Sequence, residues 1–347
     1  MGHISNNVAI SNNNKQFLCS CNTSEKKITK VERISLEAEV ITDSIHASLP
    51  GRLIVFNDYV VWEEVFASDK FLHVVNLQTR KEVGRMGDVG QGPKEFSAPN
   101  ISRSYDDYVL VSDFGTKHQA YFSIERFLAG EDYYIPVPNS IKINPKSNFR
   151  LLEIEKGQFI TLQPNSDKLL ELWNRPYFYS FGKFPIPESL RKRGRFSYFQ
   201  GNVAYNPDLK KLVYTSYDFP YMAIYTKSGK SFKLQTEVKG KFDYSVSSGG
   251  ELKRNHDSKR GPRELTLTLD YIVTVERDPT IDQTDENEVG RDPMKLPHTV
   301  FIYDYEGNLL KIANLGFPVV RITADTKNNT LYAIVVMEDY ALVKYEL

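Results

Sequence analysis

The sequence predicts an all-β protein, a six-bladed β-propeller closed by an N-terminal strand, and three observations support this prediction. Short apolar runs bounded by turn residues recur at roughly 50-residue intervals, the spacing of a repeated small sheet. Aromatic residues make up 12% of the chain, with 21 Tyr and 20 Phe, and such residues favour pleated, half-buried strands. No amphipathic helical pattern of convincing length interrupts the runs. The repeated unit is therefore a sheet without helices.

The middle strand of each unit is the clearest in the sequence. Six such strands are expected, at Tyr59–Trp62, Tyr108–Val111, Phe159–Leu162, Leu212–Thr215, Tyr271–Thr274 and Leu331–Ile334. Most are followed by a further strand, as at Leu72–Val75, Met222–Tyr225, Val300–Tyr303 and Ala341–Lys344. Six middle strands indicate six blades.

The two ends of the chain are expected to share the final blade. The last unit contains Val319–Ile322, Leu331–Val336 and Ala341–Leu347, and then lacks an outermost strand. The alternating segment Ile28–Ile34 precedes the first unit, and we predict that it fills this place. Closing the ring in this way removes two exposed sheet edges at once. The prediction divides the chain into a tail, residues 1–27, and a propeller, residues 28–347.

Two glycine-proline turns precede β-rich segments, at Gly87–Phe96 and, as a weaker echo, at Gly261–Leu265. The first could be mistaken for a loop that binds phosphate. It lacks the Gly-Lys-Ser/Thr ending and is not surrounded by a strand-to-helix unit, so the phosphate-loop interpretation fails. We predict that both are connectors between blades, with Gly87, Gly90 and Gly92 at positive φ.

Composition excludes two classes of partner. The chain has 44 Lys and Arg against 44 Asp and Glu, so it has no global positive field to attract phosphate backbones, and we expect no nucleic acid. The printed chain contains no run of about 18 apolar residues, the length that crosses a bilayer as a helix. Any membrane contact is therefore expected only through a lipid anchor.

The two cysteines suggest such an anchor. Leu18-Cys19-Ser20-Cys21 resembles a bacterial lipobox, in which Cys21 would carry the lipid, and the polar segment 22–27 resembles the tether that follows. However, Asn12–Gln16 is polar where a signal peptide needs an apolar region. Two interpretations stay open: a remnant lipoprotein signal with its tether, or a disordered polar tail.

The Gly-Pro-x-Glu-Phe turn, the six-fold spacing and the lipobox-like start together resemble the TolB-like six-bladed propellers. These are related to the NHL-repeat type and are abundant as envelope lipoproteins of Bacteroides-type bacteria. The resemblance covers nearly the whole chain from about Lys27 onward. It implies a propeller located in the cell envelope, in the periplasm or on the outer membrane, and it does not identify a ligand.

Candidate binding residues follow from the expected geometry, because the innermost strands of a propeller line a central channel and ligands commonly bind at its mouth. The residues near the turns of these strands are Asn100, Arg103, Asn202, Tyr205, Arg321 and Asp325. We predict that these six line the channel.

Other polar clusters have simpler interpretations. The basic and aromatic stretch Arg191–Phe199 is expected to be a solvated loop, as are Lys253–His256 and Lys259–Arg260. The acidic span Glu276–Asp292 contains oxygen ligands of the kind calcium prefers, but their order does not match an EF-hand loop. We expect it to be a disordered or solvated insertion. His73, inside an apolar strand, is expected to be a packing residue.

No catalytic motif or metal-ligand spacing is present in the sequence. The primary hypothesis is a monomeric, non-catalytic envelope module that binds a glycan, peptide or protein at the channel mouth or on a face. The alternative is a metal-dependent hydrolase or lactonase with an ion at the channel centre, for which Asn100, Asn202 and Asp325 are the nominated residues. We expect no cofactor under the first hypothesis and calcium under the second.

Overall fold

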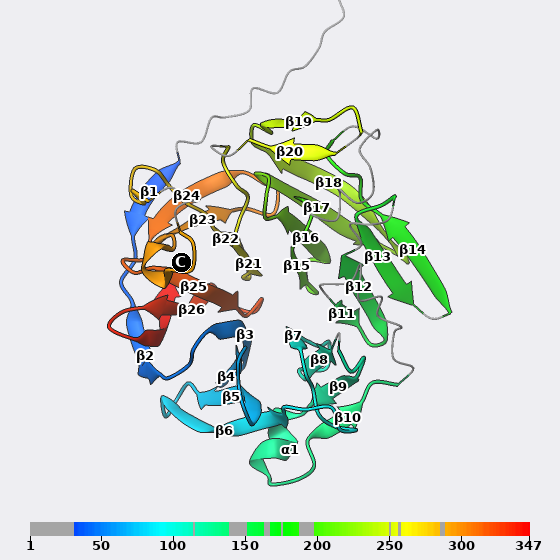
Figure 1. The fold of residues 1–347 in the computed structure, drawn as a ribbon, viewed down its shortest axis with the longest axis vertical. Helices are drawn as coiled ribbons and strands as arrows, with labels where there is room; N and C mark the ends of the chain where they lie inside the picture. The colour runs from blue at the N-terminus through cyan, green and yellow to red at the C-terminus, as the bar shows by residue number, and fades with distance from the viewer. Residues whose placement is uncertain are drawn as a thin grey trace, which may run out of the picture. The chain divides into compact units, whose positions relative to one another are not determined.

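Six sheets follow one another around a central axis, each with its first strand innermost (Figure 1). The computed structural model of the protein describes residues 31–113, 115–138, 151–162, 167–174, 176–186, 198–249, 251–255, 258–284 and 289–347. The predicted tail, with Cys21, and the basic segment 191–195 lie outside these residues. The innermost strands of neighbouring sheets contact one another all the way around, from β3 to β7, β11, β15, β21, β25 and back to β3. The protein is therefore a six-bladed β-propeller, as the sequence predicts.

Blades 1 to 3 are antiparallel sheets of four strands each. Blade 1 contains β3 (Pro50–Phe56), β4 (Tyr59–Glu64), β5 (Lys70–Asn76) and β6 (Lys81–Asp88); blade 2 contains β7 (Pro99–Arg103), β8 (Val109–Asp113), β9 (Gln119–Phe122) and β10 (Tyr134–Pro136); blade 3 contains β11 (Leu151–Glu155), β12 (Gln158–Leu162), β13 (Leu170–Asn174) and β14 (Tyr177–Phe181). A short helix, α1 (Ile124–Leu128), connects β9 to β10.

Blades 4 to 6 follow the same plan with additions. Blade 4 contains β15 (Gly201–Asn206), β16 (Lys211–Ser216), β17 (Tyr221–Ser228) and β18 (Ser231–Lys239), and a separate hairpin of β19 (Tyr244–Val246) and β20 (Leu252–Arg254) follows it. Blade 5 contains β21 (Glu264–Leu267), β22 (Ile272–Val275), β23 (Thr299–Tyr303), β24 (Leu309–Asn314) and β1 (Glu32–Ser35). Blade 6 contains β25 (Val319–Ala324), β26 (Thr330–Val336), β27 (Tyr340–Glu346) and β2 (Glu39–Ile45). A 3-10 turn, Pro293–Lys295, lies between β22 and β23.

The six predicted middle strands are confirmed, since they correspond to β4, β8, β12, β16, β22 and β26, the second strand of each blade. These strands are almost wholly buried, because both faces of each inner strand pack against neighbouring blades. The resulting continuous apolar runs are what made them visible in the sequence. Among the described residues, no helix is long and apolar enough to cross a membrane.

The prediction that Ile28–Ile34 closes the last blade is wrong, although an N-terminal strand does close it. β2, residues Glu39–Ile45, pairs antiparallel with β27 as the outer strand of blade 6. β1 instead pairs in parallel with β24 and becomes a fifth strand of blade 5. The first residues of the predicted segment, 28–30, lie outside the described residues.

Burial explains why β2 takes the closing place. Ile41 and Ile45 are buried in the apolar cluster that joins blade 6 to blade 1, together with Trp62 and Leu342. β1 presents mostly exposed side chains, and Ile34 is only half-buried. Burial of apolar area stabilises the folded state, so the closing position between blades 6 and 1 favours β2, which buries more apolar side chains than β1.

Each seam between neighbouring blades has its own apolar cluster. The clusters of blades 1 and 2, 3 and 4, and 5 and 6 are large, and the smallest among the described residues joins blades 2 and 3. Its buried members are Leu110, Val137, Leu151 and Phe159. Stability is therefore distributed around the ring and is not held in one central core.

Both glycine-proline turns are connectors that lead into an innermost strand, as predicted. Gly87 and Gly90 have φ of 79° and 158°, but Gly92 is not among the positive-φ residues, so that part of the prediction is wrong. Gly92 instead donates its backbone N–H to Glu95 Oε2 at 2.8 Å. At Gly261 the constraint is space, because a Cβ there would collide with the carbonyl oxygens of Ser216 and Phe219.

His73 is a packing residue, as predicted. It is 1% exposed, and its ring stacks on Trp62 with a centroid separation of 3.8 Å. Its two ring nitrogens lie 3.1 Å from Glu64 Oε2 and 2.8 Å from Glu82 Oε2. Both polar atoms of this buried ring therefore have partners within the blade.

Candidate functional site at the channel mouth

The central channel contains two cavities, one above the other along the axis. The first, of about 530 Å³, is lined by residues near the starts of β3, β7, β15, β21 and β25. The second, of about 340 Å³, is lined largely by the later residues of all six innermost strands. The five innermost strands that line both cavities, β3, β7, β15, β21 and β25, therefore run from the first cavity towards the second. We call the two ends the first mouth and the second mouth.

Charged side chains gather at the first mouth. Its lining includes four arginines and two glutamates: Arg52, Arg260, Arg263, Arg321, Glu63 and Glu264. The chain as a whole has no net charge, so this excess of arginine is local. Guanidinium groups bind carboxylates in a planar, two-point geometry, which makes the first mouth suited to an acidic ligand.

Arg321 connects three blades at this mouth. It projects from β25, and its Nε donates to the carbonyl oxygen of Gly51 at 3.0 Å. Its Nη1 lies 3.1 Å from Glu264 Oε1, which belongs to β21. None of its contacts with the described residues uses Nη2. One side of the guanidinium is thus fixed, and the other can meet a ligand.

Arg52 links the two cavities, since it lines both. Its Nη1 donates to the carbonyl oxygen of Ile101 at 3.0 Å, which ties β3 to β7. This bond orients the guanidinium across the channel. Arg52 and Arg321 therefore approach the first mouth from neighbouring innermost strands, β3 and β25.

Glu63 is the most perturbed acid at the first mouth. It follows the apolar part of β4 and is 6% exposed, and burial raises its pKa to about 7 against the opposing charge of Arg321. Its Oε2 accepts a hydrogen bond from the backbone N–H of Arg52 at 3.2 Å. Gly51 leaves space for it, because a Cβ at Gly51 would lie 2.6 Å from Glu63 Oε2. A buried acid that titrates near neutral pH inside a cavity is typical of a functional site.

The six candidate residues divide between the two ends of the channel. Asn100 and Arg321 line the first mouth. Asn202 lines the second cavity, but its side chain bonds to residues of the first mouth, since its Nδ2 donates to the carbonyl oxygen of Arg263 at 3.1 Å and its Oδ1 accepts from Tyr217 at 3.0 Å.

The remaining three lie towards the second mouth. Arg103 and Tyr205 line the second cavity, and Nη1 of Arg103 lies 3.4 Å from Oδ1 of the buried Asp325. Arg103 also pairs with Asp107 at 2.5 Å and lies over the ring of Phe56. Burial, with a smaller contribution from Glu155, raises the pKa of the Tyr205 hydroxyl to about 12. This second group is largely occupied by its own contacts.

Sequence reasoning missed Arg52, Glu63 and Glu264 as site residues. Glu264 is the glutamate of the second Gly-Pro-x-Glu turn, and Glu63 is an acid at the end of a strongly apolar strand. A repeated turn motif and an acid at the end of an apolar strand are the two sequence signals that could have identified Glu264 and Glu63 as site residues. The sequence could not show that β3, β4 and β21 bring these three residues to one cavity, since β21 lies about 200 residues after β3 and β4 along the chain.

The prediction that the acidic span Glu276–Asp292 is a disordered or solvated insertion is wrong for Glu276, Asp278 and Asp282, which are buried, whereas Asp292 is exposed. Asp278 is 2% and Asp282 7% exposed. Asp282 accepts hydrogen bonds from the His298 backbone at 2.7 Å and from Thr299 Oγ1 at 2.6 Å. These bonds satisfy the carboxylates inside the loop between β22 and β23, which explains their burial.

The basic pair Lys259–Arg260 is solvated, as expected, since the two side chains are 53% and 40% exposed. Both side chains line cavities, and Lys259 Nζ lies 3.2 Å from Glu276 Oε2. Among the described residues, no group of three or more His, Cys, Asp or Glu side chains is arranged to hold a metal ion.

Comparison with known proteins agrees with this architecture. Residues 10–327 match the family model described as TolB-like 6-blade propeller-like. No curated protein matches the chain.

Three solved structures share the fold at about one-tenth identity. A protein from Bacteroides fragilis described as exported is 10% identical, with a TM-score of 0.57, and the match covers 91% of this chain and 98% of that one. A member of the DUF4221 family from Bacteroides vulgatus is 11% identical, with a TM-score of 0.53, and the match covers 90% and 98%. A gluconolactonase from Xanthomonas campestris is 9% identical, with a TM-score of 0.51, and the match covers 89% and 88%.

Proposed function

Because the chain belongs to the TolB-like 6-blade propeller family, we propose that it is a non-catalytic binding module whose first mouth holds a small sugar that carries a carboxylate. A propeller fold does not specify an activity, so the ligand has to be inferred from the chemistry of the mouth. The observation that carries the proposal is the convergence of four arginines on one cavity in a chain without net charge.

The other lining groups favour a hydroxylated ligand over a bare anion. Glu264 and, when ionised, Glu63 offer acceptor oxygens, and Asn100 and Tyr217 offer both donors and acceptors at the same cavity. A sugar acid uses both sets, since its carboxylate meets arginine and its hydroxyls donate to carboxylate oxygens. The cavity of about 530 Å³ falls within the range typical of small-molecule sites.

Calorimetry with galacturonate and galactose tests this proposal, because the two sugars differ in the carboxylate. We expect galacturonate to bind and galactose to bind at least about tenfold more weakly, a difference that one charge-assisted pair accounts for. Arg321→Ala and Arg52→Ala should each weaken galacturonate binding.

Lys156→Ala is the matched control, since Lys156 is 85% exposed in the turn after β11, at the second mouth. This variant should bind like the unchanged protein. Equal affinity for both sugars, or an undiminished affinity in Arg321→Ala with an unchanged melting temperature, would overturn the proposal.

A metal-dependent hydrolase or lactonase is the second candidate, and its support is that oxygen donors line the same mouth. Of the three nominated residues, Asn100 lines the first mouth, whereas Asn202 lines the second cavity and Asp325 follows the far end of β25, so an ion at the first mouth would draw on Glu63 or Glu264 as well. Arg321 lies against both of these acids, and its charge competes with a cation. Stoichiometric calcium in protein purified without chelator, with lactone turnover, would favour this candidate.

The location we propose is the cell envelope, with Cys21 carrying a lipid. The lipobox-like residues 18–21 support this proposal, and a lipid chain would hold the propeller at a membrane surface. Metabolic labelling with a fatty acid should mark the protein in cells and should fail to mark Cys21→Ser. Labelling that persists in Cys21→Ser would contradict the assignment to this residue.

A further inference from the structure

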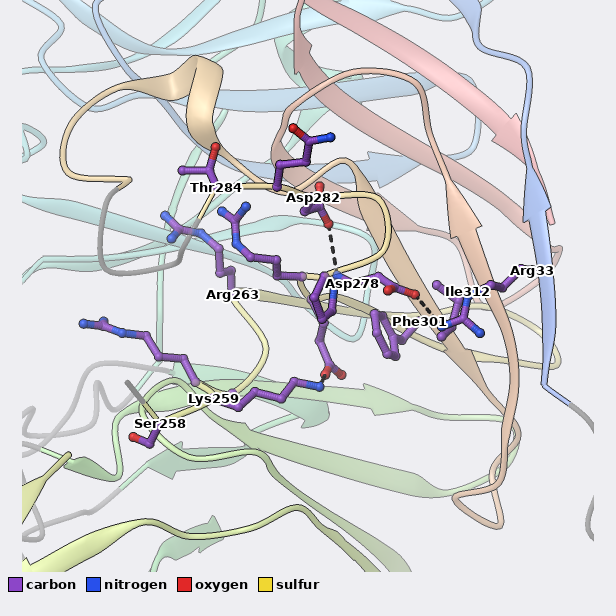
Figure 2. Close-up of a pocket in the computed structure, with 15 residues that line it drawn as sticks. Arg33, Ser258, Lys259, Arg263, Asp278, Asp282, Thr284, Phe301 and Ile312 are labelled. Carbon is purple, nitrogen blue, oxygen red and sulfur yellow. Dashed lines mark hydrogen bonds and ion pairs between the residues drawn. The ribbon is translucent and has the colours of Figure 1, made fainter. Parts of the chain in front are cut away.

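Two more cavities open on the same face of the propeller as the first mouth. One, of about 560 Å³, is lined by the connector before β21, the loop after β22 and the outer strands of blade 5 (Figure 2). The other, of about 410 Å³, lies between blades 4 and 5 and is lined by residues of β17, β18 and β23. β22 runs back towards the first mouth, so the loop that follows it lies on that face. Together we call these two cavities the flank groove.

One short segment, residues 258–263, borders all three cavities. Arg260, Gly261 and Arg263 line both the first mouth and the larger flank cavity. Ser258 and Lys259 line both flank cavities. Because this segment is packed against blade 4 through Gly261, its backbone is held between the cavities. The cavities therefore follow one another outward from the channel.

In the flank groove most acidic side chains lie deep in the cavities, and basic side chains lie nearer the surface. The three acids of its larger cavity, Glu276, Asp278 and Asp282, are buried and already bonded, whereas Asp243 at the smaller cavity is only partly buried. Glu276 lies 2.9 Å from Thr274 Oγ1 and 3.1 Å from the Tyr303 hydroxyl, and Asp278 accepts hydrogen bonds from Thr280. Its cations reach outward, with the side chain of Lys259 53% exposed and Lys241 exposed at the smaller cavity. A ligand in the groove would meet positive charge.

The groove also has an apolar wall. Phe301 and Ile312 line the larger cavity, and Lys259 Nζ lies 5.1 Å from the centre of the Phe301 ring. Figure 2 shows Phe301 and Ile312 between Lys259 on one side and Arg33 on the other. An aromatic ring beside cationic tips suits a sugar, whose C–H face packs on the ring while its carboxylate meets the cations.

We propose that the protein binds an acidic polysaccharide, with one sugar acid in the first mouth and the following units along the flank groove. This inference depends on the proposed function of the mouth and extends it from a single sugar to a chain. Carboxylate acceptors beside the cations, together with an apolar wall, favour a chain that carries many hydroxyl donors over a nucleic acid, whose backbone phosphates only accept hydrogen bonds.

The experiment measures affinity against ligand length. Galacturonate and its oligomers of two, four and six units are titrated into the full chain, with maltohexaose as the neutral chain of equal length. We expect the affinity to rise by about tenfold or more from one unit to six, since further sites on one ligand add to the first. Maltohexaose should bind weakly or not at all.

Variants in the flank groove separate this inference from the proposed function. Lys259→Gln with Lys241→Gln should abolish the rise with length and leave galacturonate itself unaffected, whereas Lys156→Gln at the second mouth should change neither. A melting temperature for each variant shows that it is folded. Single Lys241→Gln provides a milder test, because this exposed lysine has no described ion pair.

The outcomes are distinct. If galacturonate binds and the hexamer binds no better, the mouth proposal stands and the groove inference falls. If neither acidic ligand binds, both fall. If a single-stranded oligonucleotide binds as tightly as the hexamer at equal salt, the groove recognises charge alone and the assignment to polysaccharide is overturned.

Discussion

Nη2 of Arg33 lies 2.8 Å from Oδ2 of Asp278, although 245 residues separate them in the chain. Arg33 belongs to β1, the fifth strand of blade 5, and Asp278 begins the loop that walls the flank groove. The N-terminal strand therefore supports the loop as well as the sheet.

Arg33→Ala should destabilise the protein modestly. The buried Asp278 would keep its hydrogen bonds from Thr280 but lose its cation, and we expect a loss of about 1 kcal/mol because Arg33 itself is half-exposed. Arg33→Lys should recover part of this loss. Urea unfolding measures both, and an Arg33→Ala protein as stable as the original would show that the ion pair contributes nothing.

Truncation should distinguish the two N-terminal strands. Removing residues 1–36 deletes β1 and should lower the melting temperature while blade 6 stays closed. Removing residues 1–46 also deletes β2, which exposes the edge of β27 and the apolar cluster between blades 6 and 1, and this protein should aggregate. Equal melting temperatures for the two truncated proteins would show that β2 does not close the ring.

Glu63→Gln should make stability less dependent on pH. The pKa of Glu63 is raised to about 7 in the folded protein from 4.5, so the unfolded chain releases this proton first and stability falls as pH rises from about 4.5 to 7. Above pH 7 the ionised, buried acid costs up to about 3 kcal/mol, and glutamine removes this cost. Denaturant unfolding at pH 5 and pH 8 should show a much larger gain for Glu63→Gln at pH 8 than at pH 5; a gain of equal size at both pH values would contradict the assignment.

Gly261→Ala should be among the most damaging small substitutions. The new methyl group would collide with backbone oxygens of Ser216 and Phe219, and backbone cannot move aside as a flexible side chain can, so we expect a loss of about 2 kcal/mol or more. Gly249→Ala is the matched control, since the new methyl group would lie 3.6 Å from Ser247 Oγ, an ordinary van der Waals contact. Thermal unfolding compares the two; similar small losses would mean that the connector relaxes.

Some features of the site could be expected from sequence and others could not. The six candidates were placed on innermost strands because turn spacing marks strand starts, and Asn100 and Arg321 do line the first mouth. Glu63 and Arg52 were missed, because their place depends on the register between β3 and β4 and on the close approach allowed by Gly51. Strand register and close packing are set by contacts in the folded protein, so a local sequence pattern does not reveal them.

By itself, the sequence determined the number of blades and the identity of their second strands. Those strands are buried on both faces, so their apolar runs stand out locally. Only the tertiary structure decided which N-terminal segment closes the ring, since Ile28–Ile34 and Glu39–Ile45 have similar alternation and differ in what they bury. It also decided that Asp278 and Asp282 are buried and that distant arginines share one cavity. These outcomes depend on packing between blades, because each of these contacts joins residues that lie far apart in the sequence, and its free energy cannot be read from either segment alone.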